Sequence, residues 1–305
     1  MKSFMTAAIL VAAFGGVAIA QTRTLTDGAS RYDYGNTQDG INGNADLNPT
    51  GVTQFTNDWI SHNQFFYRVG TGANANANGI RTIGALGSRA FTQVSTNVGR
   101  FDYTNLGTTA GGLFNASITT TLTNSGGGAV NLLSRILLTN NSATNPLTIN
   151  FYNLVSPNVS TTANDDSLAS VGGSTTNFRA TETGSSNFVD INGFDNSRFQ
   201  LGINRTTTPA GADRIPALFF QSSGAGGATG LNLTNLNSSS TNIFGVSSAL
   251  QWSFVIPASG SVEFYSAIGF NQAAVPAPSA MAMLCLGGLA ATRRRRAVRS
   301  ATQIA

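Results

Sequence analysis

Hydrophobic and polar residues alternate along much of this chain, and the alternation is clearest over Phe114–Leu122. A period of two places successive side chains on opposite faces of a β-strand. We therefore predict a strand that has one buried face and one polar face. The buried face would carry Phe114, Ala116, Ile118, Thr120 and Leu122, and the polar face Asn115, Ser117, Thr119 and Thr121.

Two further pairs of alternating segments are each separated by a short run of residues that favour turns. The first pair is Val130–Leu138 and Leu147–Val155, separated by Asn140–Pro146, and the second is Leu250–Ile256 and Val262–Phe270, separated by Pro257–Gly260. In Leu147–Val155 the inward set would be Leu147, Ile149, Phe151 and Val155. We predict that each pair forms a β-hairpin and that the second hairpin closes the domain.

The body of the chain is rich in Asn, Thr, Ser and Gly, which disfavour helices in general. Many short strands joined by Gly, Asn and Pro loops are typical of a sandwich of antiparallel sheets. We predict an all-β, antiparallel β-sandwich. A β-helix is the alternative because asparagine-rich turns also suit it, although no fixed repeat is visible.

The first 20 residues have the three parts of a secretory signal peptide. Lys2 supplies the positive charge, an apolar run extends from Phe4 to Ile19, and small residues stand at Ala18 and Ala20. We predict a signal helix over residues 1–20, export through the Sec translocon, and cleavage after Ala20. The alternative is an uncleaved N-terminal membrane anchor, for which the apolar run is short.

The C-terminal end combines a Pro-Ala-Pro motif, an apolar stretch over residues 280–292, and an arginine run. As a helix, this stretch would reach only about 20 Å, against about 30 Å for the hydrocarbon core of a bilayer. The arginines favour the cytoplasmic side, so the body would lie outside the inner membrane. We predict a short apolar helix that holds the inner membrane only transiently.

This tail resembles the PEP-CTERM sorting signal of Gram-negative envelopes. The resemblance covers about 20 residues: Val275, Pro276, Ala277, Pro278, Arg293, Arg294, Arg295 and Arg296 occupy the motif positions. Ala277 stands where the family pattern has glutamate, and residues 297–305 extend beyond the arginines. The resemblance implies processing by an exosortase-type enzyme and association with exopolysaccharide or biofilm. A plain C-terminal membrane anchor is the alternative.

The basic pI of 9.6 comes from the two ends of the chain. Of 17 basic residues, Lys2 and the five arginines of residues 293–299 account for six, so residues 21–275 carry 11 arginines against 13 acidic residues. A nucleic-acid partner would require a basic stripe on the folded domain, and we predict none. We divide the chain into a signal peptide (1–20), an extracellular all-β domain (21–272) and a sorting tail (273–305).

Groups suited to catalysis are scarce in the body, which has one histidine, His62, and two glutamates, Glu182 and Glu263. The single cysteine, Cys285, lies in the tail, so no disulfide within the chain is expected. Asp165-Asp166 is the most compact acidic pair, but adjacent strand residues point to opposite faces. We predict no catalytic residues and a protein that is not an enzyme.

Two runs of oxygen-bearing side chains, interrupted by glycine, are candidates for Ca²⁺ binding. They contain Asp39, Asn42, Asn44 and Asp46 in the first run, and Asp190, Asn192 and Asp195 in the second. Neither run matches the complete twelve-residue loop of a helix–loop–helix calcium site, and such sequences are also common in turns. We therefore predict no cofactor, with Ca²⁺ as the one alternative.

The aromatic residues Trp59, Phe65, Phe66, Tyr67 and Trp252 could either stack on sugars or form core, and the surrounding apolar pattern favours core. The leading hypothesis is a structural protein of the cell surface or extracellular matrix, sorted by an exosortase-type system. One alternative is a carbohydrate-binding adhesin, which would show an exposed aromatic strip. The other is a polysaccharide hydrolase or lyase, which would show two carboxylates facing each other across a groove.

Overall fold

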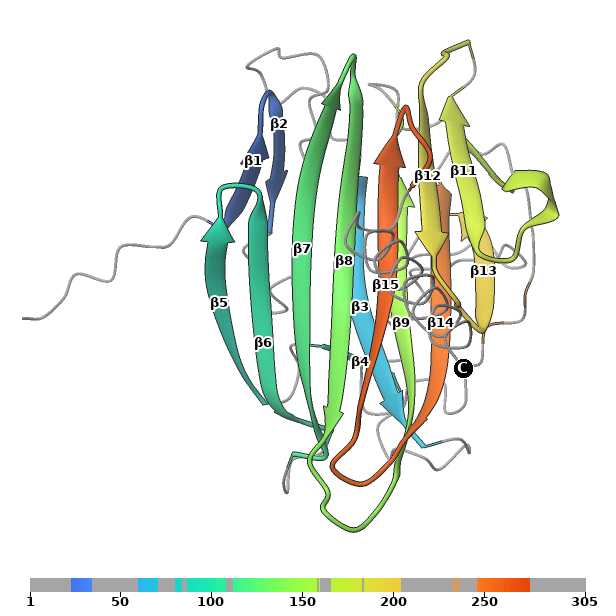
Figure 1. Cartoon of the computed structure of the whole chain (residues 1–305). Coiled ribbons are helices and arrows are strands. Elements are labelled where there is room, and N and C mark those ends of the chain that lie inside the picture. Colours follow the sequence, from blue (N-terminus) through green and yellow to red (C-terminus); the bar gives the residue numbers. More distant parts are fainter. Residues whose placement is uncertain are drawn as a thin grey trace, which may run out of the picture.

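Two antiparallel sheets pack face to face in the computed structural model, and a small hairpin lies beside them (Figure 1). The structure describes residues 23–34, 60–70, 80–83, 87–107, 112–157, 159, 166–182, 184–203, 233, 235 and 246–274. The predicted antiparallel all-β sandwich is confirmed and the β-helix alternative is wrong. The predicted signal helix and tail helix lie outside the described residues.

The larger sheet has eight strands in the order β10-β11-β12-β15-β8-β7-β6-β5. Its strands, in chain order, are β5 (Ser88–Ser95), β6 (Val98–Leu106), β7 (Phe114–Gly126), β8 (Ala129–Asn140), β10 (Asp166–Ser170), β11 (Asn177–Glu182), β12 (Phe188–Gly193) and β15 (Ser261–Phe270). A 3₁₀ turn, η1 (Val171–Gly173), lies between β10 and β11.

The smaller sheet has five strands in the order β13-β14-β9-β3-β4. Its strands, in chain order, are β3 (Ile60–Val69), β4 (Arg81–Thr82), β9 (Leu147–Pro157), β13 (Arg198–Ile203) and β14 (Val246–Ile256). The hairpin of β1 (Thr24–Asp27) and β2 (Ser30–Asp33) contributes Leu25 and Tyr32 to the main core. Among the described residues, no helix is both long and apolar enough to cross a bilayer.

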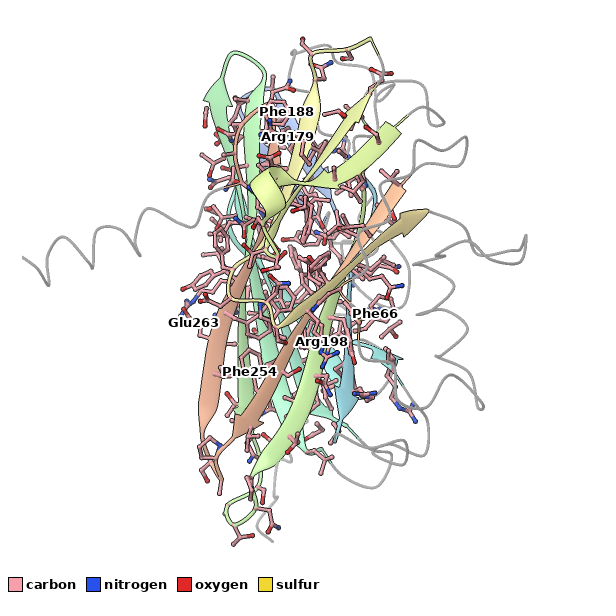
Figure 2. All side chains as sticks on the ribbon, turned by 90° about the vertical axis from the view of Figure 1, so that its right-hand side faces the viewer. Phe66, Arg179, Phe188, Arg198, Phe254 and Glu263 are labelled. Carbon is pink, nitrogen blue, oxygen red and sulfur yellow. The ribbon has the colours of Figure 1, made fainter. Side chains whose placement is uncertain are left out.

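The alternation of β7 matches the prediction, since Phe114, Ala116, Ile118, Thr120 and Leu122 are all buried. The same pattern in β9 and β14 places Phe151 and Trp252 in the core between the sheets. Side chains fill the space between the two layers, as Figure 2 shows with the sandwich turned by 90°. The apolar faces of both sheets therefore bury each other, which is the main source of stability in a sandwich.

Both hairpins predicted from the turn residues are wrong. β8 pairs with β7 and β15, whereas β9 pairs with β3 and β14, so residues 141–146 carry the chain from one sheet to the other. Residues 257–260 do the same between β14 and β15. Turn residues mark where the chain reverses, but a reversal can lead either to a neighbour in the sheet or to the facing sheet.

The two crossovers lie side by side and are joined by Asn140. The Nδ2 atom of Asn140 donates to the carbonyl oxygens of Ile256 (3.2 Å) and Pro257 (3.0 Å), and its backbone nitrogen donates to the carbonyl of Gly260 (2.9 Å). Asn140 is 3% exposed. This asparagine therefore satisfies buried backbone carbonyls where both crossovers leave their sheets.

A row of small residues crosses the inner face of the larger sheet from β6 to β12. The cross-strand register places them opposite one another in the order Gly99, Thr120, Ser134, Ser266 and Gly193. A Cβ atom on Gly99 would lie 3.0 Å from the Tyr34 hydroxyl, and one on Gly193 would lie 3.1 Å from the Trp252 ring. Because the residues of the row are small, they leave space at its two ends, which the side chains of Tyr34 and Trp252 fill.

Candidate functional site

A polar groove of about 250 Å³ lies on the smaller sheet. Its described lining residues are Arg68, Thr148, Asn150, Arg198, Gln251, Ser253, Phe254 and Val255. They come from strands β3, β9, β13 and β14, which are neighbours in the sheet but distant in the sequence. Figure 2 shows Arg198 and Phe254 near this part of the sandwich, and Glu263 on its other side.

Cross-strand register brings the groove residues together. Asn150 of β9 lies opposite both Arg68 of β3 and Ser253 of β14. In the next row, Gln251 of β14 lies opposite both Arg198 of β13 and Tyr152 of β9. Directly opposite residues of an antiparallel pair have neighbouring side chains on the same face. The polar set therefore forms two adjoining rows on the outer face of the smaller sheet.

Hydrogen bonds among the side chains hold the amides of the groove in place. The Oδ1 atom of Asn150 accepts from Gln251 Nε2 (3.1 Å) and from Ser253 Oγ (2.7 Å). Asn150 Nδ2 donates to the carbonyl of Gly70 (3.2 Å), and Gln251 Nε2 also donates to Ser253 Oγ (3.1 Å). Asn150 and Gln251 are buried, so this network is preorganised rather than assembled when a ligand arrives.

Leu233 attaches a separate part of the chain to one end of the groove. Its backbone nitrogen donates to Gln251 Oε1 (2.8 Å), and its carbonyl accepts from Arg198 Nη1 (3.1 Å). Its side chain is fully buried in a small apolar cluster on the outer face of the smaller sheet, with Phe66, Ile80, Tyr152, Leu154 and Ala249. This apolar cluster therefore adjoins the polar rows, since Tyr152 lies opposite Gln251.

The described lining residues carry two guanidinium groups and no carboxylate. Arg68 is 1% exposed, whereas Arg198 lies exposed at the surface. Burial raises the pKa of the Tyr152 hydroxyl to about 12, while the positive charges of Arg68 and Arg198 act in the opposite direction. Both arginines thus contribute positive potential at this part of the sheet, where negative charge or hydrogen-bond acceptors are favoured.

Val255 adds an apolar surface to the groove. It is 69% exposed, one of the two exposed large hydrophobic side chains among the described residues, and the other is Val94 on β5. Val255 thus places exposed apolar surface beside the fixed polar groups of the groove. The arrangement is suited to recognition of a ligand that accepts hydrogen bonds.

The second predicted calcium run is partly engaged in an ion pair. Asp190 is fully buried on β12 and accepts two hydrogen bonds from Arg179, at 2.6 Å from Nε and 2.8 Å from Nη2. Asn192 follows in the same strand, and Asp195 is exposed in the turn after it. The described residues contain no group of three His, Cys, Asp or Glu side chains that could hold a metal.

Several predicted site residues lie outside the described residues, so their roles stay predictions. They are Ala18 and Ala20 of the cleavage site, Asp39, Asn42, Asn44 and Asp46 of the first calcium run, and Val275, Pro276, Ala277, Pro278, Arg293, Arg294, Arg295 and Arg296 of the sorting signal. His62 lies in β3, opposite Ser156. Asp165 lies outside the described residues, and Asp166 begins β10.

The predicted core role of the aromatic residues is confirmed for those that the structure describes. Phe65, Phe66, Tyr67 and Trp252 are each at most 2% exposed, and Trp59 lies outside the described residues. Trp252 also donates from Nε1 to the carbonyl of Phe194 (2.9 Å). The described aromatic residues of this set therefore offer no open stacking platform.

Two carboxylates elsewhere on the described surface are paired with arginines. Asp102 pairs with Arg100 (2.9 Å), and Glu263 pairs with Arg135 (2.5 Å). These pairs lie on the larger sheet, away from the groove. The two facing carboxylates expected of a glycoside hydrolase are absent from the described lining of the groove.

Sequence reasoning missed the groove residues altogether. Arg68, Asn150, Arg198 and Gln251 are polar residues at positions where an alternating strand would present its solvent face. The one available signal was that Arg68 and Gln251 interrupt strongly apolar segments. That signal does not say that the two residues share a face of one sheet.

Comparisons with known proteins give similarity of fold alone. No protein-family model and no curated protein sequence matches this chain. A solved structure described as a "putative aldose 1-epimerase" from Escherichia coli K12 is 10% identical, with 82% of this chain and 97% of that chain covered and a TM-score of 0.46. The structure of the protein HI1317 is 8% identical, with 81% and 90% covered and a TM-score of 0.35.

These comparisons contradict the prediction that the chain is not an enzyme. One of the similar structures is described as a "putative aldose 1-epimerase", which is the name of an enzyme. We withdraw that prediction. Similarity of structure assigns no activity or substrate to this chain, because one fold can support many functions.

Proposed function

We propose that this protein is exported to the bacterial cell envelope or extracellular matrix and binds polysaccharide in the groove of the smaller sheet. The observation that carries the proposal is the set of fixed amides, hydroxyls and guanidinium groups beside the exposed Val255. Sugar rings present many hydrogen-bonding groups together with apolar C–H faces. The guanidinium groups can donate to the hydrogen-bonding groups of a sugar and Val255 can pack against a C–H face, while the fixed amides and hydroxyls shape the groove.

The route to the surface rests on the two ends of the sequence. A signal peptide would direct the chain to the Sec translocon, and the PEP-CTERM-like tail would hold it in the inner membrane until an exosortase-type enzyme processed it. Both ends place the body outside the inner membrane, where exopolysaccharide is available. The proposed polysaccharide partner thus agrees with the proposed location in a Gram-negative-type envelope or biofilm.

Binding is tested with polysaccharide isolated from the envelope of the native host. We expect Val255→Asp to weaken binding at least tenfold in affinity electrophoresis, because the new carboxylate would occupy guanidinium donors that the ligand needs. Val94→Asp is the matched control, since Val94 is similarly exposed but lies on β5 of the other sheet. Equal binding by both variants, or no binding by the unaltered protein, would contradict the proposal.

Sorting is tested by the intact mass of the protein recovered from host envelope and culture medium. We expect loss of residues 1–20 and of everything after about Pro278. A chain that keeps residues 280–305 would instead be a simple tail-anchored protein, and the proposed exosortase processing would be wrong.

A further inference from the structure

We infer that the groove selects acidic saccharides, with Arg198 as the group that recognises a carboxylate on the sugar and Arg68 as a second positive charge beside it. This inference rests on the proposed polysaccharide-binding function and names the class of polymer that the groove would bind.

The neutral polar groups are largely engaged with one another. Asn150 Oδ1 accepts two hydrogen bonds, Asn150 Nδ2 donates one, and Gln251 Oε1 accepts from the backbone of Leu233. Ser253 Oγ both donates to Asn150 and accepts from Gln251. These groups shape the groove, but they keep little capacity for a ligand.

The guanidinium group of Arg198 has more donors than its hydrogen bond to Leu233 uses. A guanidinium has five N–H donors and no acceptor, and Arg198 gives one Nη1 hydrogen bond to Leu233. Its remaining donors form a planar fork that matches a carboxylate. Arg198 is exposed, so a polymer can reach it without rearrangement of the sheet.

Arg68 places a second positive charge in the same groove at a buried position. Buried charge acts in a lower dielectric than surface charge, so its attraction for an anion is screened less by salt. The described lining residues include no carboxylate that would compete for the same anion. A sugar acid would therefore gain an interaction that a neutral sugar of equal size lacks.

The test compares oligogalacturonate with its fully methyl-esterified form by calorimetric titration of the processed protein. The two ligands share their sugar rings and differ by the negative charge. We expect the free acid to bind at least tenfold more tightly, and we expect this preference to shrink as salt concentration rises. Arg198→Gln should abolish the preference, and Arg198→Lys should restore part of it because charge returns without the fork.

Arg135→Gln is the matched control, because it removes the same charge from the larger sheet. Equal binding of acid and ester would overturn the inference while leaving the polysaccharide proposal standing, provided that Val255→Asp weakens both. Binding of inorganic phosphate as tight as that of the oligomer would also overturn it, since the groove would then be a general anion site. If neither oligomer binds, the acidic-saccharide inference fails, and the host-polysaccharide experiment decides the proposed function by itself.

Discussion

The hydroxyl of Ser266 donates a hydrogen bond of 2.7 Å to Oδ1 of Asn153, and this bond joins the two sheets through the middle of the sandwich. Asn153 in turn donates to Asn63 Oδ1 (2.9 Å), and Asn63 donates to the hydroxyl of Tyr32 (3.2 Å). All four residues are at most 2% exposed. A connected polar network thus lies inside a core that is otherwise apolar.

Removing one member of this network should destabilise the fold. Ser266→Ala leaves Asn153 Oδ1 without its inter-sheet donor, and an unsatisfied buried polar group costs about 1 to 3 kcal/mol. We expect a fall of that size in the free energy of unfolding measured with urea. Ser261→Ala, at an exposed position of the same strand, should change it by no more than about 0.5 kcal/mol. Equal effects of the two substitutions would show that the network does not stabilise the core.

The row of small residues should not tolerate an added methyl group. A Cβ atom on Gly99 would lie 2.9 Å from the Phe91 ring and 3.1 Å from Leu25, so Gly99→Ala should cost about 1 to 3 kcal/mol through overpacking. Thermal unfolding measures the loss. Ala90→Val adds apolar volume at an exposed position of β5 and should have little effect. An unchanged melting temperature for Gly99→Ala would mean that the hairpin β1–β2 can move away from the sheet.

Alkaline pH should unfold the protein through its buried tyrosines. Burial raises the pKa of Tyr32, Tyr34, Tyr67 and Tyr152, the last to about 12, from an ordinary value of 10.0. The unfolded chain therefore loses these protons at lower pH than the folded chain does. The stabilisation is fully present below about pH 10 and is lost as pH rises toward 12.

Phenolate absorbance and circular dichroism, followed together, check this expectation. Most of the six tyrosines should ionise in the same transition in which the β-sheet signal disappears. Gradual ionisation near pH 10 with the fold intact would contradict the burial of these hydroxyls.

Replacing Asp190 distinguishes a structural role, through its ion pair with Arg179, from a role in calcium binding. Asp190→Asn should lower the free energy of unfolding by about 1 to 3 kcal/mol. The reason is that the buried carboxylate of Asp190 accepts two charge-assisted hydrogen bonds from Arg179, and a neutral amide cannot replace both. If Asp190 acts only through Arg179, the loss will be the same with added Ca²⁺ and with a chelator. A loss confined to calcium-containing buffer would instead support the predicted metal site at Asp190, Asn192 and Asp195.

The strands themselves follow from local sequence. Apolar residues such as Phe114, Ala116 and Ile118 recur at a spacing of two, and that spacing buries one side of the strand. The fold class and the buried state of Phe65 and Trp252 needed nothing more than this pattern. Asn153 shows the limit of this pattern. It is a polar residue at a fully buried inward position, which the apolar pattern alone would not assign to the core.

Tertiary structure alone decided which strands are neighbours. The alternation of β14 and β15 is the same whether they pair in one sheet or face each other across the core, so the residues 257–260 could not distinguish a hairpin from a crossover. The groove has the same origin, since Arg68, Asn150, Arg198 and Gln251 meet only because β3, β9, β14 and β13 pair in a fixed register. The sequence determined which face of each strand is buried, because that depends on neighbours along the chain. Strand order and register depend on contacts between distant segments, which only the folded molecule brings together.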